Sequence, residues 1–207
     1  MGKFEKLFNQ FLDCVQTLQK ALNVSFTEAL VETFDNLEQG KIKVENGAPD
    51  EQTVAELSKK YQSLDYDEIS QKDKAQVFTF LTLKAINDDG FDVNKMPTPP
   101  AISTVIAMLM HKLVKNEKVE IVDPTIGTGI LLFSIISQLK ALNHSKDNYQ
   151  LVGIDNDEEM LNLADVAAHL NDFDIELYCQ DALMPWMCSN PDVVVSDLPI
   201  GYYPLDQ

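Results

Sequence analysis

The sequence contains no arginine, and this absence limits the surfaces that the chain can present. All 16 basic residues are lysines, 33 residues are acidic, and the formal net charge is −17. Arginine is the usual bidentate reader of guanine and a favoured phosphate ligand. A nucleic-acid surface also needs a basic stripe that displaces counterions. We therefore expect this chain on its own to have little affinity for DNA or RNA.

Cysteine, histidine and long apolar runs are also scarce. The three cysteines have no metal-type spacing and the three histidines show no paired spacing, so we predict free thiols and no metal site. No apolar run approaches the roughly 20 residues that span a bilayer. The N-terminus lacks the apolar region of a signal peptide. These absences predict a cytoplasmic protein without membrane contact.

Residues 1–95 read as an all-helical N-terminal domain. Apolar residues recur at helical spacing in residues 4–22, and Ser25 precedes Glu28 by three residues, which is a capping-box pattern. Two further helical stretches follow a polar loop, the first of them capped by Asp50. This half shows no catalytic constellation, which favours a packing or interaction role.

The pattern changes after the proline-rich stretch "FDVNKMPTPPAI", so residues 96–207 form a second domain. The runs "KVEIVD", "YQLVGID", "DIELYCQD" and "PDVVVSD" are typical of strands, and the first two are followed by helical patterns. Strands that alternate with helices at this pitch predict a parallel α/β sheet, Rossmann-like, with about four strands.

An aspartate stands at or just past the end of each predicted strand, at positions 123, 155, 181 and 197. One such residue is ordinary, because aspartate favours turns and helix N-caps. Four in succession indicate a ligand site, since ligands of open parallel sheets bind at the carboxyl ends of the strands.

The loop "DPTIGTGILL" narrows the choice of ligand. Gly127 and Gly129 allow a tight turn and a close backbone approach. A dinucleotide fingerprint requires a third small residue, where this chain has Leu132, and Asp123 would repel a pyrophosphate. Carboxylates suit an amino group, ribose hydroxyls and an adenine amine instead. These three groups together describe S-adenosylmethionine better than NAD.

The successive motifs "DPTIGTG", "GIDND", "CQDAL" and "SDLPIGYYP" resemble those of class I S-adenosylmethionine-dependent methyltransferases. The closest likeness is to adenine-specific DNA methylases, and "MPTPPAISTVIAMLM" resembles the segment that precedes their glycine loop. A helical domain ahead of such a core also resembles restriction-system modification subunits and a group of bacterial methylase-like proteins. The resemblance covers about residues 96–204 and implies DNA as a partner of the complete protein.

The resemblance implies a role for each matching position. Thr98 and Pro99 would contact the methionine end of the cofactor, and the first strand end and its loop would line the methionine side, namely Asp123, Pro124, Gly127 and Gly129. Asp155 would bind the ribose, and Asp181 with Ala182 the adenine. The catalytic loop would consist of Asp197, Leu198, Pro199 and Ile200.

That loop departs from the family pattern of polar residue, two prolines and an aromatic residue. Leu198 replaces the first proline and Ile200 replaces the aromatic ring, which would stack on a flipped base. Tyr202 or Tyr203 could supply a ring instead, or could pack against the sheet. Trp186 is expected in the core or an interface rather than in a substrate cleft.

Three functions follow from these observations. The first is an S-adenosylmethionine-dependent methyltransferase of the adenine-amine type. The second is a cofactor-binding regulatory or interaction protein without catalysis, which the substitutions at Leu198 and Ile200 favour. The third, a nicotinamide-dependent oxidoreductase, is disfavoured by Leu132.

The family's sheet has seven strands, and the sequence accounts for four, so we expect a fragment that lacks a C-terminal part and has little activity by itself. The alternative is a natural short form that a partner completes. In such sheets the first and fourth strands are neighbours. The fourth strand is then an exposed edge through which the chain can self-associate.

Overall fold

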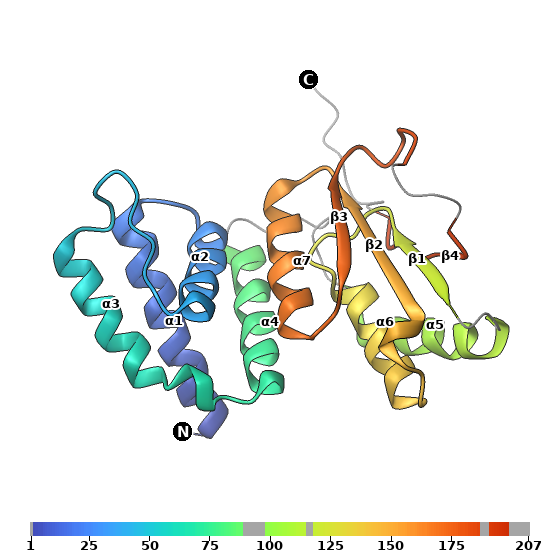
Figure 1. Cartoon of the computed structure of the whole chain (residues 1–207), viewed down its shortest axis with the longest axis horizontal. Helices are drawn as coiled ribbons and strands as arrows, with labels where there is room; N and C mark the ends of the chain where they lie inside the picture. The colour runs from blue at the N-terminus through green and yellow to red at the C-terminus, as the bar shows by residue number, and fades with distance from the viewer. Residues whose placement is uncertain (1, 89–97, 115–117, 187–190, 199–207) are drawn as a thin grey trace. The chain divides into compact units, whose positions relative to one another are not determined.

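The computed structural model describes residues 2–88, 98–114, 118–186 and 191–198. The chain forms two compact units, Met1–Gly90 and Phe91–Gln207 (Figure 1). The boundary expected between residues 95 and 96 falls in the span 89–97, which lies outside the described residues. No helix in the described part of the chain is both long enough and apolar enough to cross a membrane.

The first unit is helical. Its elements are α1 (Lys3–Leu22), α2 (Phe26–Gln39), α3 (Glu51–Leu64), a short 3₁₀ helix (Tyr66–Glu68) and α4 (Gln71–Asp88).

The predicted helix starts are confirmed by their hydrogen bonds. The Ser25 hydroxyl accepts from Glu28 N at 3.0 Å while the Glu28 carboxylate accepts from Ser25 N at 2.9 Å. Asp50 caps α3 by accepting from Thr53 N at 2.7 Å. Each cap satisfies helix N–H groups that have no partner within the helix.

Aromatic rings join the helices of this unit. The Phe11 and Phe34 rings stack at 5.1 Å, and the Phe34 and Phe78 rings meet edge to face at 4.9 Å. All three side chains are buried, so rings from α1, α2 and α4 form one core.

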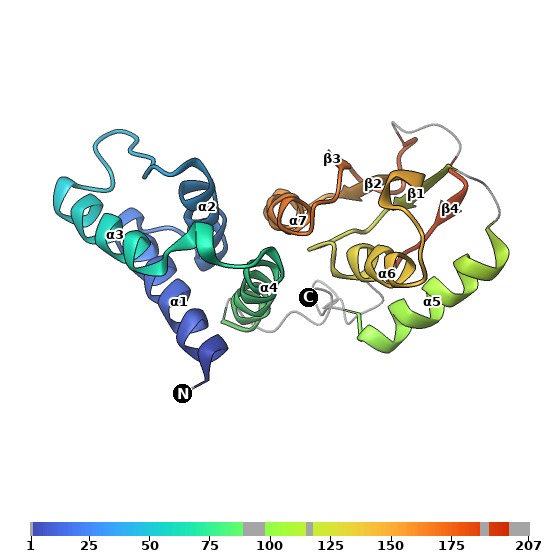
Figure 2. The ribbon, with the colours of Figure 1, turned by 60° about the horizontal axis from the view of Figure 1, so that its bottom comes forward.

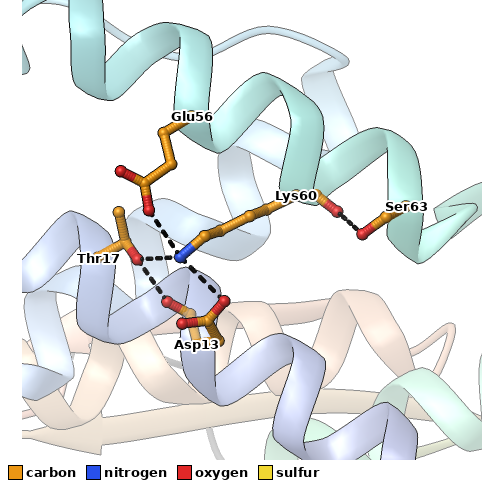
Figure 3. Close-up of polar contacts among 5 residues, drawn as sticks. All are labelled: Asp13, Thr17, Glu56, Lys60 and Ser63. Atoms are coloured by element: carbon orange, nitrogen blue, oxygen red, sulfur yellow. Dashed lines mark hydrogen bonds and ion pairs between the residues drawn. The ribbon is translucent and has the colours of Figure 1, made fainter.

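A charged contact joins α1 to α3 at the surface of this core (Figure 3). The Lys60 ammonium lies 2.9 Å from carboxylate oxygens of Asp13 and of Glu56, and 2.7 Å from the Thr17 hydroxyl. Partial burial acts to lower the pKa of Lys60, but hydrogen bonds to the two carboxylates outweigh it, and the pKa is raised. The ammonium therefore remains charged between the two helices.

The second unit is an α/β layer, as predicted. Its elements are α5 (Pro100–Leu113), β1 (Val119–Asp123), α6 (Ile130–Ala141), a 3₁₀ turn (Lys146–Asn148), β2 (Tyr149–Asp155), α7 (Glu158–Leu170), β3 (Ile175–Cys179) and β4 (Val193–Val194).

The four strands form one parallel sheet in the order β3-β2-β1-β4. The predicted adjacency of the first and fourth strands is therefore confirmed. β4 is shorter than the sequence suggested, because only Val193 and Val194 pair with β1 and the described part of the chain provides no strand on its other side. Val194 is half exposed at this edge.

Helices cover one face of the sheet. Figure 2 shows α5 and α6 along this side. Their buried residues share one core with Ile121 of β1, with Leu151 of β2 and with Leu161 of α7. On the opposite face, Val122, Val152 and Ile154 are buried, and Tyr178 and Trp186 pack against them. The central residues of β1 and β2 are thus apolar on both faces, and Asp123 and Asp155 stand at the ends of these two strands.

Candidate functional site

The carboxyl ends of the strands bring the four aspartates to one edge of the sheet. β1 ends at Asp123 and β2 at Asp155. Asp181 follows the end of β3 by two residues, and Asp197 follows the end of β4 by three. Because all four strands are parallel, these residues lie at the edge where α/β sheets bind ligands.

The glycine loop connects β1 to α6 at this edge. Gly127 and Gly129 have φ values of +52° and +77°, a region that residues with a Cβ rarely occupy. A Cβ on Gly129 would also lie 2.2 Å from the buried Phe133 ring. α6 begins at Ile130, so the loop leads directly into a helix N-terminus.

The end of β2 holds this loop in place. Ile126 N donates to the Ile154 carbonyl at 2.9 Å, and Gly127 N donates to Asp155 Oδ2 at 2.8 Å. Asp155 Oδ1 accepts from Asp157 N at 3.0 Å, and the Asp155 carbonyl accepts from Gln180 N at 2.9 Å. Asp155, which the resemblance assigns to the ribose, therefore also accepts hydrogen bonds from three backbone N–H groups around it.

Asp123 is the most buried of the four carboxylates, with 1% of its surface exposed. Its Oδ1 accepts from Thr125 N at 3.1 Å. The pKa of Asp123 is raised to about 7, mainly by burial. The Thr125 hydrogen bond acts to lower it, and the charges of Asp155 and Asp197 contribute to the rise. A buried carboxylate of this kind is stabilised by a nearby cation. Pro124, the next residue, is buried too.

Two hydroxyl groups contact the segment that follows β4. Thr98 Oγ1 donates to Asp197 Oδ2 at 2.6 Å, and Thr98 stands directly before Pro99, the N-cap of α5. Thr125 Oγ1 lies 2.7 Å from Ser196 Oγ and donates to the Asp197 carbonyl at 3.3 Å. Three segments distant in sequence therefore meet at Asp197.

Of the rest of the predicted catalytic loop, the described residues include Leu198. Leu198 has 59% of its surface exposed, at the same edge as Asp197. Pro199 and Ile200 lie outside the described residues, as do Tyr202 and Tyr203.

The segment after β3 forms a compact turn. Asp181 Oδ1 accepts from Leu183 N at 2.9 Å, and the Ala182 carbonyl accepts from the Trp186 indole N–H at 2.9 Å. Trp186 is partly buried and packs on the second face of the sheet, which agrees with the expectation of a core or interface position. Leu183 and Met184 remain exposed beside Asp181, Leu183 with 92% of its surface.

The structure thus links Thr98, Asp123, Asp155 and Asp197 through the glycine loop, and Asp181 through its neighbour Gln180. Thr125 and Ser196 belong to the site but match none of the sequence motifs. Hydroxyl residues are common near glycine loops and after strands. In the sequence, these two are distinguished only by their positions close to Asp123 and Asp197. Among the described residues, no group of three or more histidine, cysteine or acidic side chains is arranged to hold a metal ion.

Comparisons with known proteins agree with this architecture. Residues 5–86 match the family model of the YtxK N-terminal helical domain, and residues 70–202 match that of N-6 DNA Methylase. The chain is 30% identical over 196 residues to the uncharacterized protein YtxK of Bacillus subtilis (strain 168), an alignment that covers 92% of this chain and 56% of that protein.

Two solved structures share the fold. A putative class I S-adenosylmethionine-dependent methyltransferase from Listeria monocytogenes has 31% identity and a TM-score of 0.79, with 97% of this chain and 60% of that chain covered. A type I restriction-modification methyltransferase subunit from Streptococcus thermophilus has 18% identity and a TM-score of 0.56, with 91% and 43% covered.

The chain spans 56% of YtxK and 60% of the Listeria protein. The N-6 DNA Methylase model covers residues 70–202, which is more than half of the chain, and a YtxK-like helical domain precedes it. The chain therefore belongs to the N-6 DNA methylase family.

Proposed function

We propose that this chain binds S-adenosylmethionine at the carboxyl edge of its sheet and forms part of a methyltransferase that acts on an amino nitrogen. The observation that carries the proposal is the assembly of the glycine loop with Asp123, Asp155 and Asp197 at one strand edge. Membership of the methylase family and the fold shared with the Listeria protein support it.

The residues present fit this cofactor. Asp123 is a buried carboxylate with a raised pKa, which a cationic amino group would stabilise in its charged form and a pyrophosphate would not. Gly127 faces open space on the side where a Cβ would stand, so the loop backbone allows close approach. In this proposal Thr98 and Pro99 would hold the methionine end. Pro124 and Gly129 would shape the loop, and Asp181 with Ala182 would contact the adenine.

S-adenosylmethionine, when bound, supplies a methyl group on a sulfonium that an amine nitrogen can displace in line. Asp197 would accept a hydrogen bond from the amino group of the acceptor and so orient the nitrogen lone pair. Its Oδ2 already accepts from Thr98, and Oδ1 has no hydrogen-bond partner among the residues that the structure describes. The protein's contribution is then mainly the positioning of the two reactants.

The acceptor class that we propose is the adenine amino group of DNA, recognised by the complete protein. The family supports this class, whereas the net charge of −17 and the absence of arginine predict that the present chain contributes little DNA affinity itself. Leu198 and Ile200 in the loop favour the second function, a protein that binds the cofactor without transferring its methyl group.

Isothermal titration calorimetry with S-adenosylmethionine, S-adenosylhomocysteine and NAD tests the cofactor. We expect the first two ligands to bind and NAD to give no heat. Asp155→Ala should weaken cofactor binding at least tenfold, because the variant loses both a ligand contact and the acceptor of Gly127 N. Asp165→Ala, which removes an exposed carboxylate on α7, is the matched control. Tight binding of NAD alone would refute the proposal.

Transfer of a labelled methyl group to DNA, RNA and protein separates the two functions. It should be measured on the chain and on any longer form in which it occurs naturally. Label in DNA supports the adenine methyltransferase. Cofactor binding without transfer to any of the three acceptors supports the regulatory protein.

A further inference from the structure

The segment from Ser196 to Leu198 lies beyond the last ladder contact of β4. Val195 N donates to the Val122 carbonyl at 2.9 Å, which is the final backbone bond from this segment to β1 in the described part of the chain. Beyond it, Ser196 and Asp197 are held by the hydroxyl groups of Thr98 and Thr125. Among the described residues, the contacts that orient Asp197 therefore come from side chains rather than from the sheet.

Thr125 is suited to this task by its place in the glycine loop. Its backbone N–H donates to Asp123 while its side chain points to the segment after β4. A hydroxyl has one proton, so donation to the Asp197 carbonyl requires that Ser196 Oγ donate to Thr125 Oγ1. The result is a short relay from Ser196 through Thr125 to the Asp197 carbonyl.

The relay holds the backbone carbonyl of Asp197, and Thr98 holds its side chain. Thr125 binds the carbonyl oxygen, and because a peptide bond is planar, this also sets the direction in which the chain enters Leu198. Thr98 binds the carboxylate. The neighbouring backbone of the glycine loop is itself held by Asp155, through Gly127 N. Thr125 thus connects the loop directly to Asp197.

We propose that Thr125 is a positioning residue for methyl transfer, which holds Asp197 at a fixed distance from the glycine loop. The inference rests on the function proposed above, in which the loop holds the cofactor and Asp197 orients the acceptor nitrogen. In-line transfer tolerates little displacement, and a misplacement of about 1 Å can cost about 100-fold in rate. A residue that ties the two sites together should therefore affect the rate of transfer more than the binding of either reactant.

The test is the isosteric variant Thr125→Val, with Thr125→Ser as the conservative rescue. We expect Thr125→Val to lower kcat for methyl transfer at least tenfold, with the KM for the acceptor and the Kd for S-adenosylmethionine changed less than about threefold. Thr125→Ser keeps the hydroxyl and should stay within about threefold of the unaltered protein. Thr104→Val, which removes a hydroxyl that donates to the Pro100 carbonyl within α5, is the control.

A second measurement does not depend on activity. Hydrogen exchange followed by mass spectrometry should show faster exchange of a peptide spanning residues 193–198 in Thr125→Val and not in Thr104→Val. The double variant Thr125→Val with Ser196→Ala should exchange no faster than Thr125→Val alone, because the two hydroxyls belong to one relay.

The outcomes separate the two proposals. Failure of the unaltered protein to bind the cofactor or to transfer a methyl group contradicts the proposed function, and the exchange rates then decide whether Thr125 holds Asp197. Unchanged kcat and unchanged exchange in Thr125→Val overturn the inference, even where the unaltered protein is an active methyltransferase. A parallel loss of cofactor affinity and kcat would show that Thr125 is a ligand contact, which also overturns it.

Discussion

The buried carboxylate of Asp123 predicts an unusual dependence of stability on pH. In the folded chain its pKa is about 7, against an ordinary value of 3.8, so the folded state binds the proton more tightly than the unfolded state. Stability therefore falls as the pH rises above about 4, and the whole penalty is present above pH 7. One pKa unit corresponds to about 1.4 kcal/mol, so the full penalty is about 4 kcal/mol, of which about 2 kcal/mol develops between pH 5.5 and pH 8.

Asp123→Asn isolates this contribution. The amide has nearly the same shape, its Oδ1 still accepts from Thr125 N, and it carries no charge to bury. Relative to the unaltered chain, the variant should gain about 2 kcal/mol in free energy of unfolding between pH 5.5 and pH 8. The comparison cancels the titration of the other carboxyl groups, which both proteins share.

Urea unfolding at the two pH values, followed by circular dichroism, measures the effect. Asp165→Asn, at an exposed position on α7, is the control and should show the same difference from the unaltered chain at both pH values. The reasoning is refuted if Asp123→Asn also differs from the unaltered chain by the same amount at pH 5.5 and pH 8, because the carboxyl would then not be buried in its charged form.

Two further predictions concern folding. Gly129→Ala should lower the free energy of unfolding by about 3 kcal/mol, because alanine is strained at a positive φ and its Cβ would clash with the Phe133 ring. Gly127→Ala should cost only about 1 kcal/mol, because a Cβ there meets open space. Equal losses in urea unfolding would contradict the packing argument. Lys60→Met should lower the free energy of unfolding by about 1 kcal/mol at low salt, because it removes the contacts with Asp13 and Glu56. This loss should be smaller in 1 M NaCl, because salt screens ion pairs. A loss that does not change with salt would show that the lysine stem, not its charge, stabilises the helical unit.

The α/β architecture could be predicted because it depends on local patterns. Apolar runs such as "QLVGID" become strands, and the family resemblance predicted that the first and fourth strands are neighbours, as they are in the order β3-β2-β1-β4. The length of β4 could not be read in the same way. "VVV" has the composition of a longer strand, but only Val193 and Val194 are paired in register with β1, and Val195 adds a single backbone bond to Val122.

The polar contacts of the site were beyond the reach of sequence patterns. Asp123, Asp155 and Asp197 stood out because four strands in succession ended on the same residue type. Thr125 and Ser196 are separated by 71 positions, and Thr98 and Asp197 by 99. Hydroxyl residues occur throughout the chain, and only the three-dimensional path of the sheet shows which of them meet. The pairing of His111 with His144 at 2.7 Å is a similar case, since their spacing of 33 residues follows no motif.

The contacts of Thr98 and Thr125 with Asp197 bear on whether the predicted catalytic loop, which departs from the family pattern, can support methyl transfer. Leu198 replaces a proline that would restrict the backbone at this point, and leucine does not fix φ. In this chain Thr125 holds the carbonyl just before Leu198, and Thr98 holds the carboxylate of Asp197. Hydrogen bonds from two other segments thus supply a restraint that the loop sequence lacks. This restraint can be tested by substitution. If the loop were fixed by Pro199 alone, removing the Thr125 hydroxyl would leave kcat unchanged, whereas a loop oriented by its neighbours should lose transfer and keep its cofactor.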